Sequence, residues 1–528
     1  MIDTKALRQK VLDLAIRGKL VPQDPNDEPA SVLLERIRQQ KQQMVKEGKL
    51  RPKDIKNDSV IFVGEDNLHY EKFADGSAKC IEDEIPFNLP DGWAWARLGN
   101  LSAAIQYGLS NSAEPQGTHR LLRITDIQDG KVDWDAVPFT TVNAPEAYLL
   151  KTGDIVFART GATVGKSFLI AETPYPSVYA SYLIRIRLLG SLSPEYIYQF
   201  FDSACYWSQI TDKSVGVGQP NCNGTSLKEL FIPLPPISEQ LRIVPTAQAL
   251  LAYVAKIDAE KNSLLSIITA TKSKILDLAI HGKLVPQDPN DEPASVLLER
   301  IRAEKEELIK QGKIKRDKKD SVIFRGEDNS YYEKIGNELE NIEMPFALPD
   351  GWAWAHLSDL VLILNGDRGQ NYPAKSKLQN EGIPFVSASN IENGIVSYDN
   401  LLCLSELQYE ALGAGKLMAG DIIYCIRGSL GKSGIFTMEK GAIASSLVIV
   451  RSVLKEVCIT DYIFVYLNSA FAGEEIKKYD NGSAQPNLAA KDFMRFLVPV
   501  PPLDEQKAIC TKLKTMFALI QNVEKSLS

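Results

Sequence analysis

Two glycine-rich segments carry the clearest chemical signal in the sequence, because each combines an arginine, a lysine and small flexible residues. The first reads Arg159-Thr160-Gly161-Ala162-Thr163-Val164-Gly165-Lys166-Ser167, and the second reads Arg427-Gly428-Ser429-Leu430-Gly431-Lys432-Ser433. A nucleotide-binding P-loop has four residues between its first glycine and its Gly-Lys pair, whereas the first segment has three and the second has two. Nucleotide hydrolysis is therefore not expected at either segment.

A glycine-rich turn of this kind still suits another chemistry. Its backbone amides and its two cationic side chains could contact the phosphates or the base edges of a nucleic acid. The alternative is structural, since a tight hairpin also needs glycines where φ is positive. Both interpretations stay open from the residues alone.

Signals for other catalytic or metal chemistry are missing from the sequence. It has no Asn-Pro-Pro-aromatic motif of a methyltransferase, no glycine fingerprint for S-adenosylmethionine and no defensible Ser/His/Asp set. Its four histidines, which we expect to be incidental surface residues, lack metal-ligand spacing: His69, His119, His281 and His356. The seven cysteines contain no C-x-x-C pair, so neither a zinc site nor a disulfide framework is expected, and a reducing cytoplasm is favoured.

Length and composition predict an ordinary soluble protein of several domains. The chain has 528 residues, of which 44% are hydrophobic and 24% are charged, so each half can bury a core. The formal net charge of -7 does not indicate a nucleic-acid partner, but phosphate contacts need only a local basic face. No apolar leader stands at the N-terminus, and no apolar run reaches the roughly 18 residues of a membrane span. We expect a soluble, unprocessed, cytoplasmic protein that does not contact a membrane.

The elements that position the glycine-rich segments occur twice along the chain. Residues 11–20 match residues 275–284 at an offset of 264, and Gln219-Pro220-Asn221 returns as Gln485-Pro486-Asn487 at an offset of 266. Half of 528 is 264. The chain is therefore predicted to be a tandem pseudo-repeat that is cut inside its own long helix.

Helical patterns mark the repeated ends. Residues 3–17 are predicted to form a helix that Gly18 ends, and residues 30–46 a charged helix that Gly48 ends. The segment after the first helix and the charged helix recur in residues 285–312. A charged helix is often a solvated face, but its occurrence beside both large domains makes docking of a partner subunit the alternative.

The longest periodic segment, residues 239–281, has apolar residues at spacings of three and four. As one helix it would be about 65 Å long at 1.5 Å per residue, and Pro245 near its start could kink it. We expect its partner to be a composite of the C-terminal and N-terminal helices, antiparallel to it. Such a rod would hold two globular domains apart and act as a ruler between them.

Two domains of similar size, residues 98–233 and 357–499, are dominated by short β-like runs. The predicted strands are 121–124, 154–157 and 182–187, then 383–386, 421–425 and 447–450, and a helix is predicted near 195–208 and near 460–479. The predicted fold class is α+β, with two similar domains built on mostly antiparallel curved sheets. Two long antiparallel coiled-coil helices separate them in a pseudo-twofold internal repeat.

Each domain follows a Pro-Asp-Gly-Trp-Ala-Trp run, at residues 90–95 and 349–354, which predicts an edge strand after a turn. We expect the tryptophans to pack in the core, with stacking on bases as the alternative. Gly153-Asp154-Ile155 recurs as Gly420-Asp421-Ile422, but residues 106–119 have little in common with 365–377. One scaffold with two unlike sets of loops is what two separate recognition tasks need.

Three motifs, each with a second copy, closely resemble the specificity subunit of type I restriction-modification systems. They are Gly-Asp-Ile-Val-Phe-Ala-Arg-Thr-Gly-Ala-Thr-Val-Gly-Lys (153–166), Gln-Pro-Asn (219–221) followed by Ile-Pro-Leu-Pro-Pro-x-x-Glu-Gln (232–240), and Leu-Ala-Ile-x-Gly-Lys-Leu-Val-Pro-Gln-Asp-Pro (14–25). The resemblance covers the whole chain. In the second copy the glycine-rich loop is one residue shorter, and Ile426-Arg427 replaces Ala158-Arg159-Thr160.

The resemblance implies two target recognition domains, each of which reads one half of a bipartite DNA site in the major groove, and a helical rod that fixes the unread gap and docks methyltransferase subunits. The expected limits are N-terminal helices in 1–50, the first recognition domain in 51–235, the central long helix and charged helix in 236–312, the second recognition domain in 313–501 and the C-terminal helix in 502–528.

Residues for base and phosphate contacts follow from side-chain chemistry applied to that family. Arginine can pair with guanine, asparagine and glutamine with adenine, and lysine with phosphate. A loop or turn hydrogen bond is the alternative role at each position, and Gln219 and Asn221 lean towards structure or general backbone contact because both copies have them. The candidates are Gln106, Tyr107, Asn111, Arg123, Arg159, Thr163, Lys166, Gln219 and Asn221 in the first domain, and Asp367, Arg368, Gln370, Asn371, Ser389, Asn390, Arg427, Lys432, Gln485 and Asn487 in the second.

The resemblance also implies partners. Double-stranded DNA, two methyltransferase subunits and translocating endonuclease subunits are expected, with S-adenosylmethionine bound in the methyltransferase subunits and no cofactor in this chain. The chain itself would catalyse nothing. Two alternatives stay open: the specificity subunit of a methylation-only complex, and an interaction scaffold that does not bind DNA.

Overall fold

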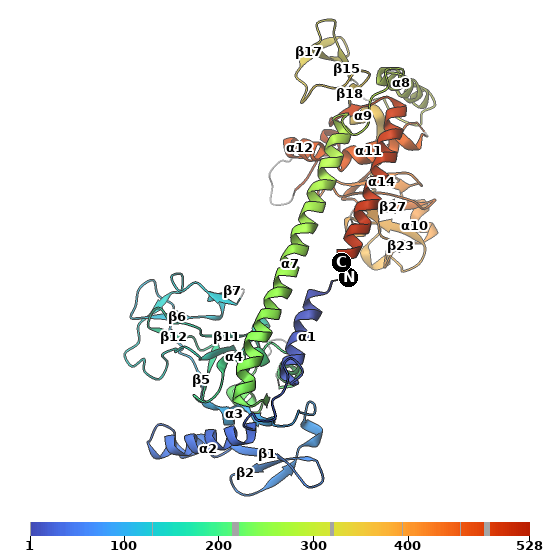
Figure 1. Ribbon diagram of the computed structural model, residues 1–528. Helices are drawn as coiled ribbons and strands as arrows, with labels where there is room; N and C mark the ends of the chain where they lie inside the picture. Colours follow the sequence, from blue (N-terminus) through green and yellow to red (C-terminus); the bar gives the residue numbers. More distant parts are fainter. Residues whose placement is uncertain are drawn as a thin grey trace. The chain divides into compact units, whose positions relative to one another are not determined.

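The computed structural model describes residues 2–128, 130–213, 221–316, 321–392, 394–454, 456–479 and 486–527 (Figure 1). The chain divides into two compact units, Ile2–Lys261 and Asn262–Ser528. The boundary falls inside one helix, α7 (Ile237–Ile280), which has 44 residues.

The first unit contains the elements α1 to β14 and the first part of α7. Its helices are α1 (Thr4–Ile16), α2 (Ala30–Lys46), α3 (Leu98–Leu101), α4 (Pro194–Phe200), α5 (Ala204–Lys213) and α6 (Gly224–Lys228). Its strands are β1 (Ser59–Val63), β2 (His69–Phe73), β3 (Ala78–Cys80), β4 (Ala94–Arg97), β5 (Ser102–Tyr107), β6 (His119–Leu122), β7 (Ile127–Gln128), β8 (Lys131–Val132), β9 (Phe139–Thr140), β10 (Ile155–Ala158), β11 (Ser167–Leu169), β12 (Ser177–Tyr179), β13 (Leu183–Leu188) and β14 (Phe231–Leu234).

The second unit repeats this order with some additions. Its helices are α8 (Ala294–Lys310), α9 (Leu357–Leu360), α10 (Glu406–Ala411), α11 (Val457–Leu467), α12 (Ala470–Tyr479), α13 (Ala490–Phe493) and α14 (Leu503–Leu527). Its strands are β15 (Ser321–Arg325), β16 (Tyr331–Ile335), β17 (Glu338–Ile342), β18 (Ala353–His356), β19 (Val361–Asn365), β20 (Ile383–Val386), β21 (Ile391–Glu392), β22 (Ile395–Val396), β23 (Cys403–Leu404), β24 (Lys416–Leu417), β25 (Ile422–Cys425), β26 (Ser433–Ile435), β27 (Gly441–Ile443), β28 (Leu447–Ser452) and β29 (Leu497–Val500).

The sheets of the two units correspond. The central sheet has the order β11-β10-β13-β5 in the first unit and begins β19-β28-β25-β26 in the second. Beside it lies a smaller sheet, β12-β6-β9 or β23-β20-β27-β24. Strand pairs are antiparallel except β6 with β12, β20 with β27 and β22 with β26. These sheets confirm the predicted α+β class with mostly antiparallel pairing.

The Trp-Ala-Trp runs enter short two-stranded sheets. β4 pairs with β14, and β18 pairs with β29. Trp95 and Trp354 are only 2% and 1% exposed, and each packs against a phenylalanine ring. The expectation of core packing is confirmed, and these rings are not available for stacking on bases.

The single helices predicted near residues 195–208 and 460–479 are wrong, because each is two helices with a break at a serine. Ser203 donates its hydroxyl to the Phe200 carbonyl and accepts from the Tyr206 amide at 3.2 Å, so it ends α4 and caps α5. Ser469 makes the same two bonds, with the Tyr466 carbonyl and the Ala472 amide. A serine hydroxyl can replace the backbone bonds that would continue a helix.

The long helix α7 is continuous through Pro245 and contacts a terminal helix in each unit (Figure 1). In the first unit the start of α1 lies beside α7, since the Thr4 hydroxyl donates to Asp258 at 2.6 Å. In the second unit Lys272 of α7 pairs with Glu524 of α14 at 2.8 Å.

The direction of these terminal helices follows from contacts at their other ends. Asp27, which follows α1, pairs with Arg242 near the start of α7 at 2.6 Å. Glu505 near the start of α14 accepts from Gln287, which follows α7, at 3.2 Å. Within each unit the terminal helix is therefore antiparallel to its part of α7, as expected. No helix of the described ranges is long and apolar enough to span a bilayer.

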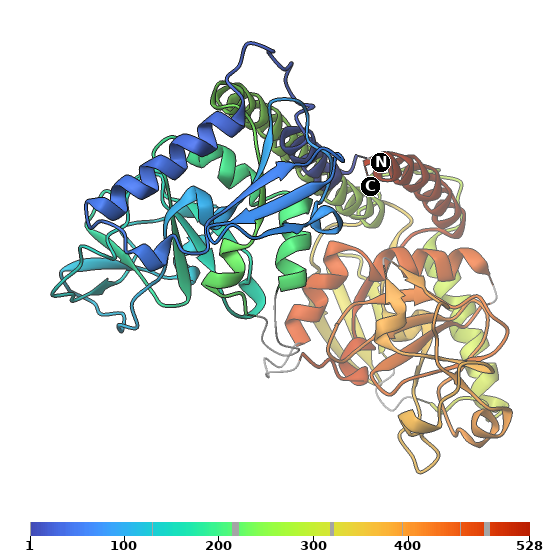
Figure 2. The ribbon, with the colours of Figure 1, turned by 90° about the horizontal axis from the view of Figure 1, so that it is seen from below.

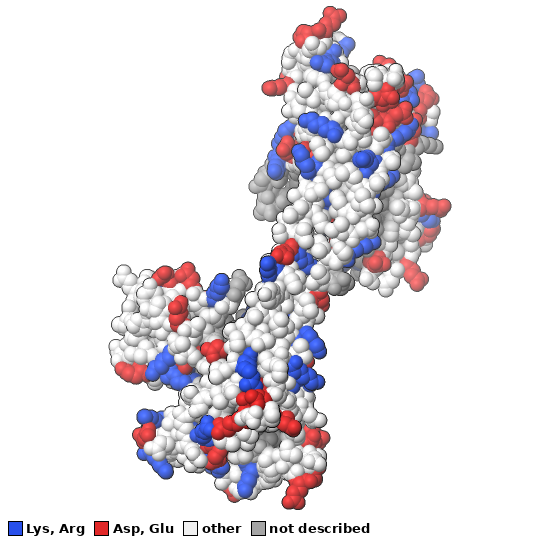
Figure 3. Space-filling view, viewed as in Figure 1, with Lys and Arg blue, Asp and Glu red and all other residues white. Residues whose placement is uncertain are grey.

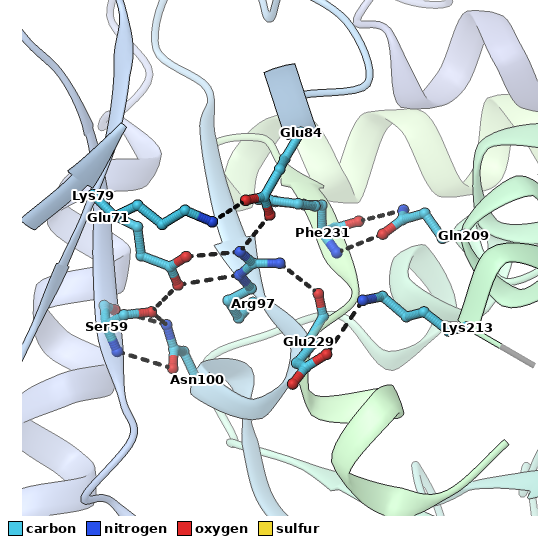
Figure 4. Close-up of polar contacts among 10 residues, drawn as sticks. All are labelled: Ser59, Glu71, Lys79, Glu84, Arg97, Asn100, Gln209, Lys213, Glu229 and Phe231. Atoms are coloured by element: carbon cyan, nitrogen blue, oxygen red, sulfur yellow. Dashed lines mark hydrogen bonds and ion pairs between the residues drawn. The ribbon is translucent and has the colours of Figure 1, made fainter. Parts of the chain in front are cut away.

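Each unit also carries a three-stranded sheet, β1-β2-β3 or β15-β16-β17, and a polar residue at the end of the neighbouring strand, β4 or β18, bonds to its second strand. In the first unit the residue is Arg97, whose guanidinium donates to both carboxylate oxygens of Glu71, at 2.7 and 3.1 Å, and to the Glu229 carbonyl at 2.7 Å (Figure 4). In the second unit His356 takes this place and bonds Glu333 at 3.0 Å. His356 is only 8% exposed, so the expectation of an incidental surface histidine is wrong there.

Candidate nucleic-acid interface

A surface groove of about 480 Å³ in the first unit collects three of the candidate residues. It lies where the loop after β5, the turn after β6, the glycine-rich turn after β10 and the start of β13 meet. The strand pairing of β10 with β13 and of β6 with β12 brings these turns to one edge. Its polar lining consists of Asn111, Arg123, Thr125, Thr160, Thr163 and Tyr182.

Arg123 is fixed in this groove by the turn that follows it. Its Nε and Nη2 atoms donate to the two oxygens of Asp126 at 3.0 and 2.6 Å, and its backbone amide donates to the same carboxylate at 2.8 Å. The hydrogen bonds from Arg123 to Asp126 raise the pKa of the arginine. The side chain is 40% exposed, so a pre-oriented guanidinium edge faces the solvent in the groove.

The glycine-rich segment is a tight hairpin. β10 and β11 pair antiparallel, and φ is +72° at Gly161 and +90° at Gly165. A Cβ at Gly165 would lie 2.5 Å from the Trp207 ring, so that position has no room for another residue. Thr163 points its hydroxyl back to the Thr160 carbonyl at 3.3 Å. The structural role of the glycines is therefore real, and contact with phosphates remains a proposal.

Arg159 lies at the end of β10 but not in the groove lining. Its backbone amide donates to the Tyr182 carbonyl at 3.1 Å, and its own carbonyl accepts from the Cys222 amide at 3.0 Å. The guanidinium lies 4.9 Å from the centre of the Tyr107 ring, and its Nε atom is buried without a hydrogen-bond partner in the described ranges. The Tyr107 hydroxyl accepts from the Gly224 amide at 2.8 Å. Arg159 and Tyr107 thus form a second cluster behind the turn.

The remaining candidates of the first domain are dispersed. Gln106 accepts a bond of 2.7 Å from buried Arg185, which lies opposite it on the neighbouring strand β13. Burial lowers the pKa of that arginine. Lys166 is exposed on the hairpin, and Asn111 donates to the Thr141 carbonyl at 3.1 Å. Asn221 is exposed opposite Thr160, and Gln219 lies outside the described residues.

In the second unit Arg427 does not occupy the position of Arg159. Ile426 makes the backbone bonds that Arg159 makes, from its amide to the Ser446 carbonyl at 3.1 Å and from the Leu488 amide to its own carbonyl at 2.9 Å. Arg427 pairs with Asn487 as Thr160 pairs with Asn221, and its Nε donates to the Asn487 side chain at 3.2 Å. In the backbone frame Ile426 therefore corresponds to Arg159, and Arg427 corresponds to Thr160.

Several candidates of the second unit organise loops. Asp367 is 9% exposed and accepts from the Gly369 and Gly413 amides at 2.6 and 2.7 Å. Those backbone bonds lower its pKa. Asn390 accepts from the Ser387 amide and hydroxyl at 3.0 and 2.7 Å, as Asp126 accepts from Arg123. These two side chains therefore have structural partners in place.

The other candidates of the second unit are at the surface. Arg368 donates to the Ser445 carbonyl at 3.3 Å, and Asn371 to the Ala411 carbonyl at 2.8 Å. Gln370, Ser389 and Lys432 are exposed. Gln485 lies outside the described residues.

Sequence reasoning missed three groove residues of the first unit: Thr125, Thr160 and Tyr182. Tyr182 is 61% exposed although it stands next to buried Leu183 in β13. The available signal was the Ala-Ser pair before it, which both domains share at 180–181 and 444–445 and which precedes unlike residues, Tyr182 and Ser446.

Comparison with known proteins agrees with this arrangement. A model of the type I restriction modification DNA specificity domain matches residues 122–267 and 349–528. The specificity subunits of the type I restriction enzymes EcoAI and EcoEI of Escherichia coli are 28% and 27% identical, each over 99% of this chain and 90% of its relative. A solved chain from a study of type I R-M complex assembly and conformational transition has a TM-score of 0.53 at 19% identity, over 84% of this chain and 94% of that chain, which shows a common fold. The chain therefore belongs to the family of type I restriction-modification specificity subunits and carries its DNA specificity domain twice.

Proposed function

We propose that each of the two specificity domains reads one half of a bipartite DNA site, and that the two halves are read through unlike side chains on one backbone frame. The observation that carries the proposal is the substitution pattern at the groove. By their backbone bonds, Tyr182 of the first unit is equivalent to Ser446 of the second, and Thr160 is equivalent to Arg427. The turn that starts at Arg123 in one unit starts at Ser387 in the other.

These substitutions change the hydrogen-bonding code. The first groove offers a guanidinium edge from Arg123 together with threonine and tyrosine hydroxyls, whereas the second unit offers serine hydroxyls and Arg427. Arginine favours the O6 and N7 atoms of guanine, and hydroxyls accept several partners. Two different half-sites are the expected result. The proposed contact residues are the candidates named above, with Thr125, Thr160 and Tyr182 added.

The helices suit the role of spacer and docking rod. α7 runs without interruption for 44 residues, so the tolerated gap between the half-sites would follow from its length. In the first unit it exposes Tyr253 by 67% and Ile257 by 38%, and in the second unit α14 exposes Leu519 by 63% and Val523 by 51%. Apolar residues at this spacing on a solvent-facing helix suit a partner helix. We assign them to two methyltransferase subunits.

In this scheme the chain supplies recognition and its partners supply chemistry. The methyltransferase subunits bind S-adenosylmethionine, and endonuclease subunits join the complex in the cytoplasm. The chain contributes no catalytic group of its own. A complex that only methylates would use the same chain, and restriction of unmodified DNA in the presence of the endonuclease subunits separates the two cases.

An exchange of domains tests the proposal. Residues 98–233 are replaced by the corresponding segment of another family member, and the modified DNA motif is read by methylome sequencing of the host. We expect one half-site to change while the other half-site and the gap stay the same. A change in both half-sites would refute the modular assignment. If the unaltered chain guided no methylation at all, DNA recognition itself would be refuted.

A further inference from the structure

The three-stranded sheets present the same outward-facing side chains in both units, and the proposed reading of DNA does not use these side chains. Residues 59–73 and 321–335 differ only at positions 63, 68, 69 and 73 and their counterparts 325, 330, 331 and 335. We define the hairpin face as the outward side chains of the first two strands of each sheet: Val60, Phe62, Tyr70 and Lys72 in the first unit, and Val322, Phe324, Tyr332 and Lys334 in the second.

The aromatic pair on this face has the same geometry twice. The Phe62 and Tyr70 rings stack with centroids 5.9 Å apart at 27°, and the Phe324 and Tyr332 rings stack at 6.0 Å and 27°. Phe62 is nevertheless 42% exposed and Phe324 41% exposed. The pair is ordered without being buried.

The turn between the strands fixes the tyrosine of this pair. The Tyr70 hydroxyl donates to Asp66 at 2.7 Å, and the Tyr332 hydroxyl donates to Asp328 at 2.8 Å. A Cβ at Gly64 would lie 2.9 Å from the Tyr70 ring, so the glycine lets the ring lie flat on the turn. The face is thus pre-organised, which lowers the conformational entropy that a partner would have to remove.

Packing inside the unit explains the inner face of the sheet but not the outer one. On the inner face Ile61 is 9% exposed and packs in one cluster with Trp95 and Phe231, while Glu71 meets Arg97. Figure 2 shows β1 and β2 of the first unit in the foreground, with no described element of that unit in front of them. A shared outer face therefore points to a partner outside the chain.

The charge around the face determines which kind of partner fits. Residues 59–85 contain two lysines and seven acidic residues, and residues 321–343 contain one arginine, one lysine and six acidic residues, giving net charges of -5 and -4. Figure 3 shows acidic side chains at the outer end of the second unit, where Figure 1 labels β17. Such a surface repels the phosphates of DNA and attracts a basic protein surface.

We propose that the hairpin face of each unit is a docking site for one methyltransferase subunit, which covers the aromatic pair with an apolar patch rimmed by lysine and arginine. This inference rests on the proposed function, in which one chain binds two copies of that subunit. Because the two faces are alike, each is expected to take its copy in the same way, whereas the two grooves bind different half-sites.

The test uses the full-length chain with its methyltransferase subunit, and native mass spectrometry counts the bound subunits. We expect two subunits on the unaltered chain, and Phe62→Ser and Phe324→Ser each to weaken binding of one subunit at least ten-fold. Phe62→Ser with Phe324→Ser is expected to weaken both. The matched control is Val63→Arg, a nearby exposed position where the second unit already has Arg325, and it should leave both affinities unchanged.

A second measurement keeps the result independent of folding. Benzoylphenylalanine at position 62 or 324 should crosslink to the methyltransferase subunit on irradiation, and crosslinks to DNA or to another copy of the chain would overturn the proposal. Unchanged affinity in the double variant would also overturn it while leaving the proposed function in place. If the unaltered chain took up no methyltransferase subunit, the proposed function would fail as well.

Discussion

Replacing Arg97 by alanine is expected to loosen the sheet β1–β3 from the first unit by about 3 kcal/mol, the lower end of the cost of leaving a buried charge unpaired. Arg97 is 14% exposed and Glu71 is 5% exposed, so the pair is largely out of water. Burial by itself would raise the pKa of Glu71, but hydrogen bonds from Arg97 and Ser59 outweigh it and lower the pKa below 4.5. The pair therefore stabilises the sheet above that pH, and its contribution is lost as the pH falls through the lowered pKa.

Apolar contacts should keep the sheet β1–β3 attached when the ion pair of Arg97 with Glu71 is removed. Ile61 and Ile81 are 9% and 1% exposed against the cluster that contains Trp95, and each contributes roughly 1.5–3 kcal/mol of attachment. The sheet should thus stay attached on average in the alanine variant but open more often. A loss of about 3 kcal/mol corresponds to about 100-fold faster amide exchange, since each 1.4 kcal/mol is about ten-fold.

The second unit supplies the matched variant, Arg97→His. Both ring nitrogens of His356 face acceptors, Glu333 at 3.0 Å and the Arg495 carbonyl at 2.9 Å, and only a doubly protonated ring donates to both. Histidine at position 97 should recover about half of the loss at pH 6 and less at pH 8. Pairing with Glu71 raises the pKa of the imidazole above its ordinary value of about 6.5, and the recovered contribution is lost as the pH rises through that raised pKa.

Hydrogen exchange of residues 59–80, followed by mass spectrometry, measures these effects locally. Lys79→Ala is the control, because Lys79 of the Lys79–Glu84 pair is 64% exposed and a solvent-exposed ion pair contributes little to attachment. Wild-type protection of residues 59–80 in Arg97→Ala, or pH-independent protection in Arg97→His, would refute the reasoning.

Three further outcomes follow from other buried or groove residues. Burial raises the pKa of Glu239 above 4.5, so its carboxylate weakens the fold at neutral pH; Glu239→Gln keeps an acceptor for Trp93 and should raise the unfolding temperature at pH 7, with a gain that vanishes as the pH falls below 4.5. Arg187→Ala leaves the carboxylate of Asp154, which is 2% exposed, without its cationic partner, and should lower the free energy of unfolding in urea by about 3–5 kcal/mol. The double variant that removes both charges should lose less stability. Tyr182→Ser should alter the base preference at one position of one half-site, seen in the methylome, with a change in discrimination of about 1–3 kcal/mol. It should change the free energy of unfolding by less than about 0.5 kcal/mol.

Most of the architecture could be predicted because it rests on local patterns that occur twice. The spacing of apolar residues predicted α7 to within two residues of its start and one residue of its end, and Gly18 and Gly48 do take positive φ after their helices. The helix breaks at Ser203 and Ser469 could not be predicted, because apolar periodicity continues across them. Whether a serine hydroxyl bonds to the backbone depends on packing that the sequence does not display.

The groove was less accessible to sequence reasoning for a geometric reason. Its lining comes from turns that only strand pairing brings together, so Arg123 and Thr163 could be chosen by type but Tyr182 could not. The position equivalent to Arg427 could not be assigned from the sequence. The glycine-rich loop is one residue shorter in the second unit, and the missing residue could fall on either side of its first glycine. Only the pairing with Asn487 decides that Arg427 stands where Thr160 stands.

The two halves share the residues that hold the frame and differ in those that line its edge. The buried pairs Asp154–Arg187 and Asp421–Arg451 have nearly the same closest distance, 2.6 and 2.7 Å. Each pair lies at the opposite end of its two strands, β10 with β13 or β25 with β28, from the variable positions. Because these charges and the central strands fix the backbone, replacing the exposed Tyr182 by serine removes few buried contacts and costs little stability. In the proposed function a change of half-site therefore needs no change of fold, whereas a change in the frame would disturb the groove and the attached sheet together. Under the proposed function, this separation lets one backbone, used twice in one chain, carry two recognition codes.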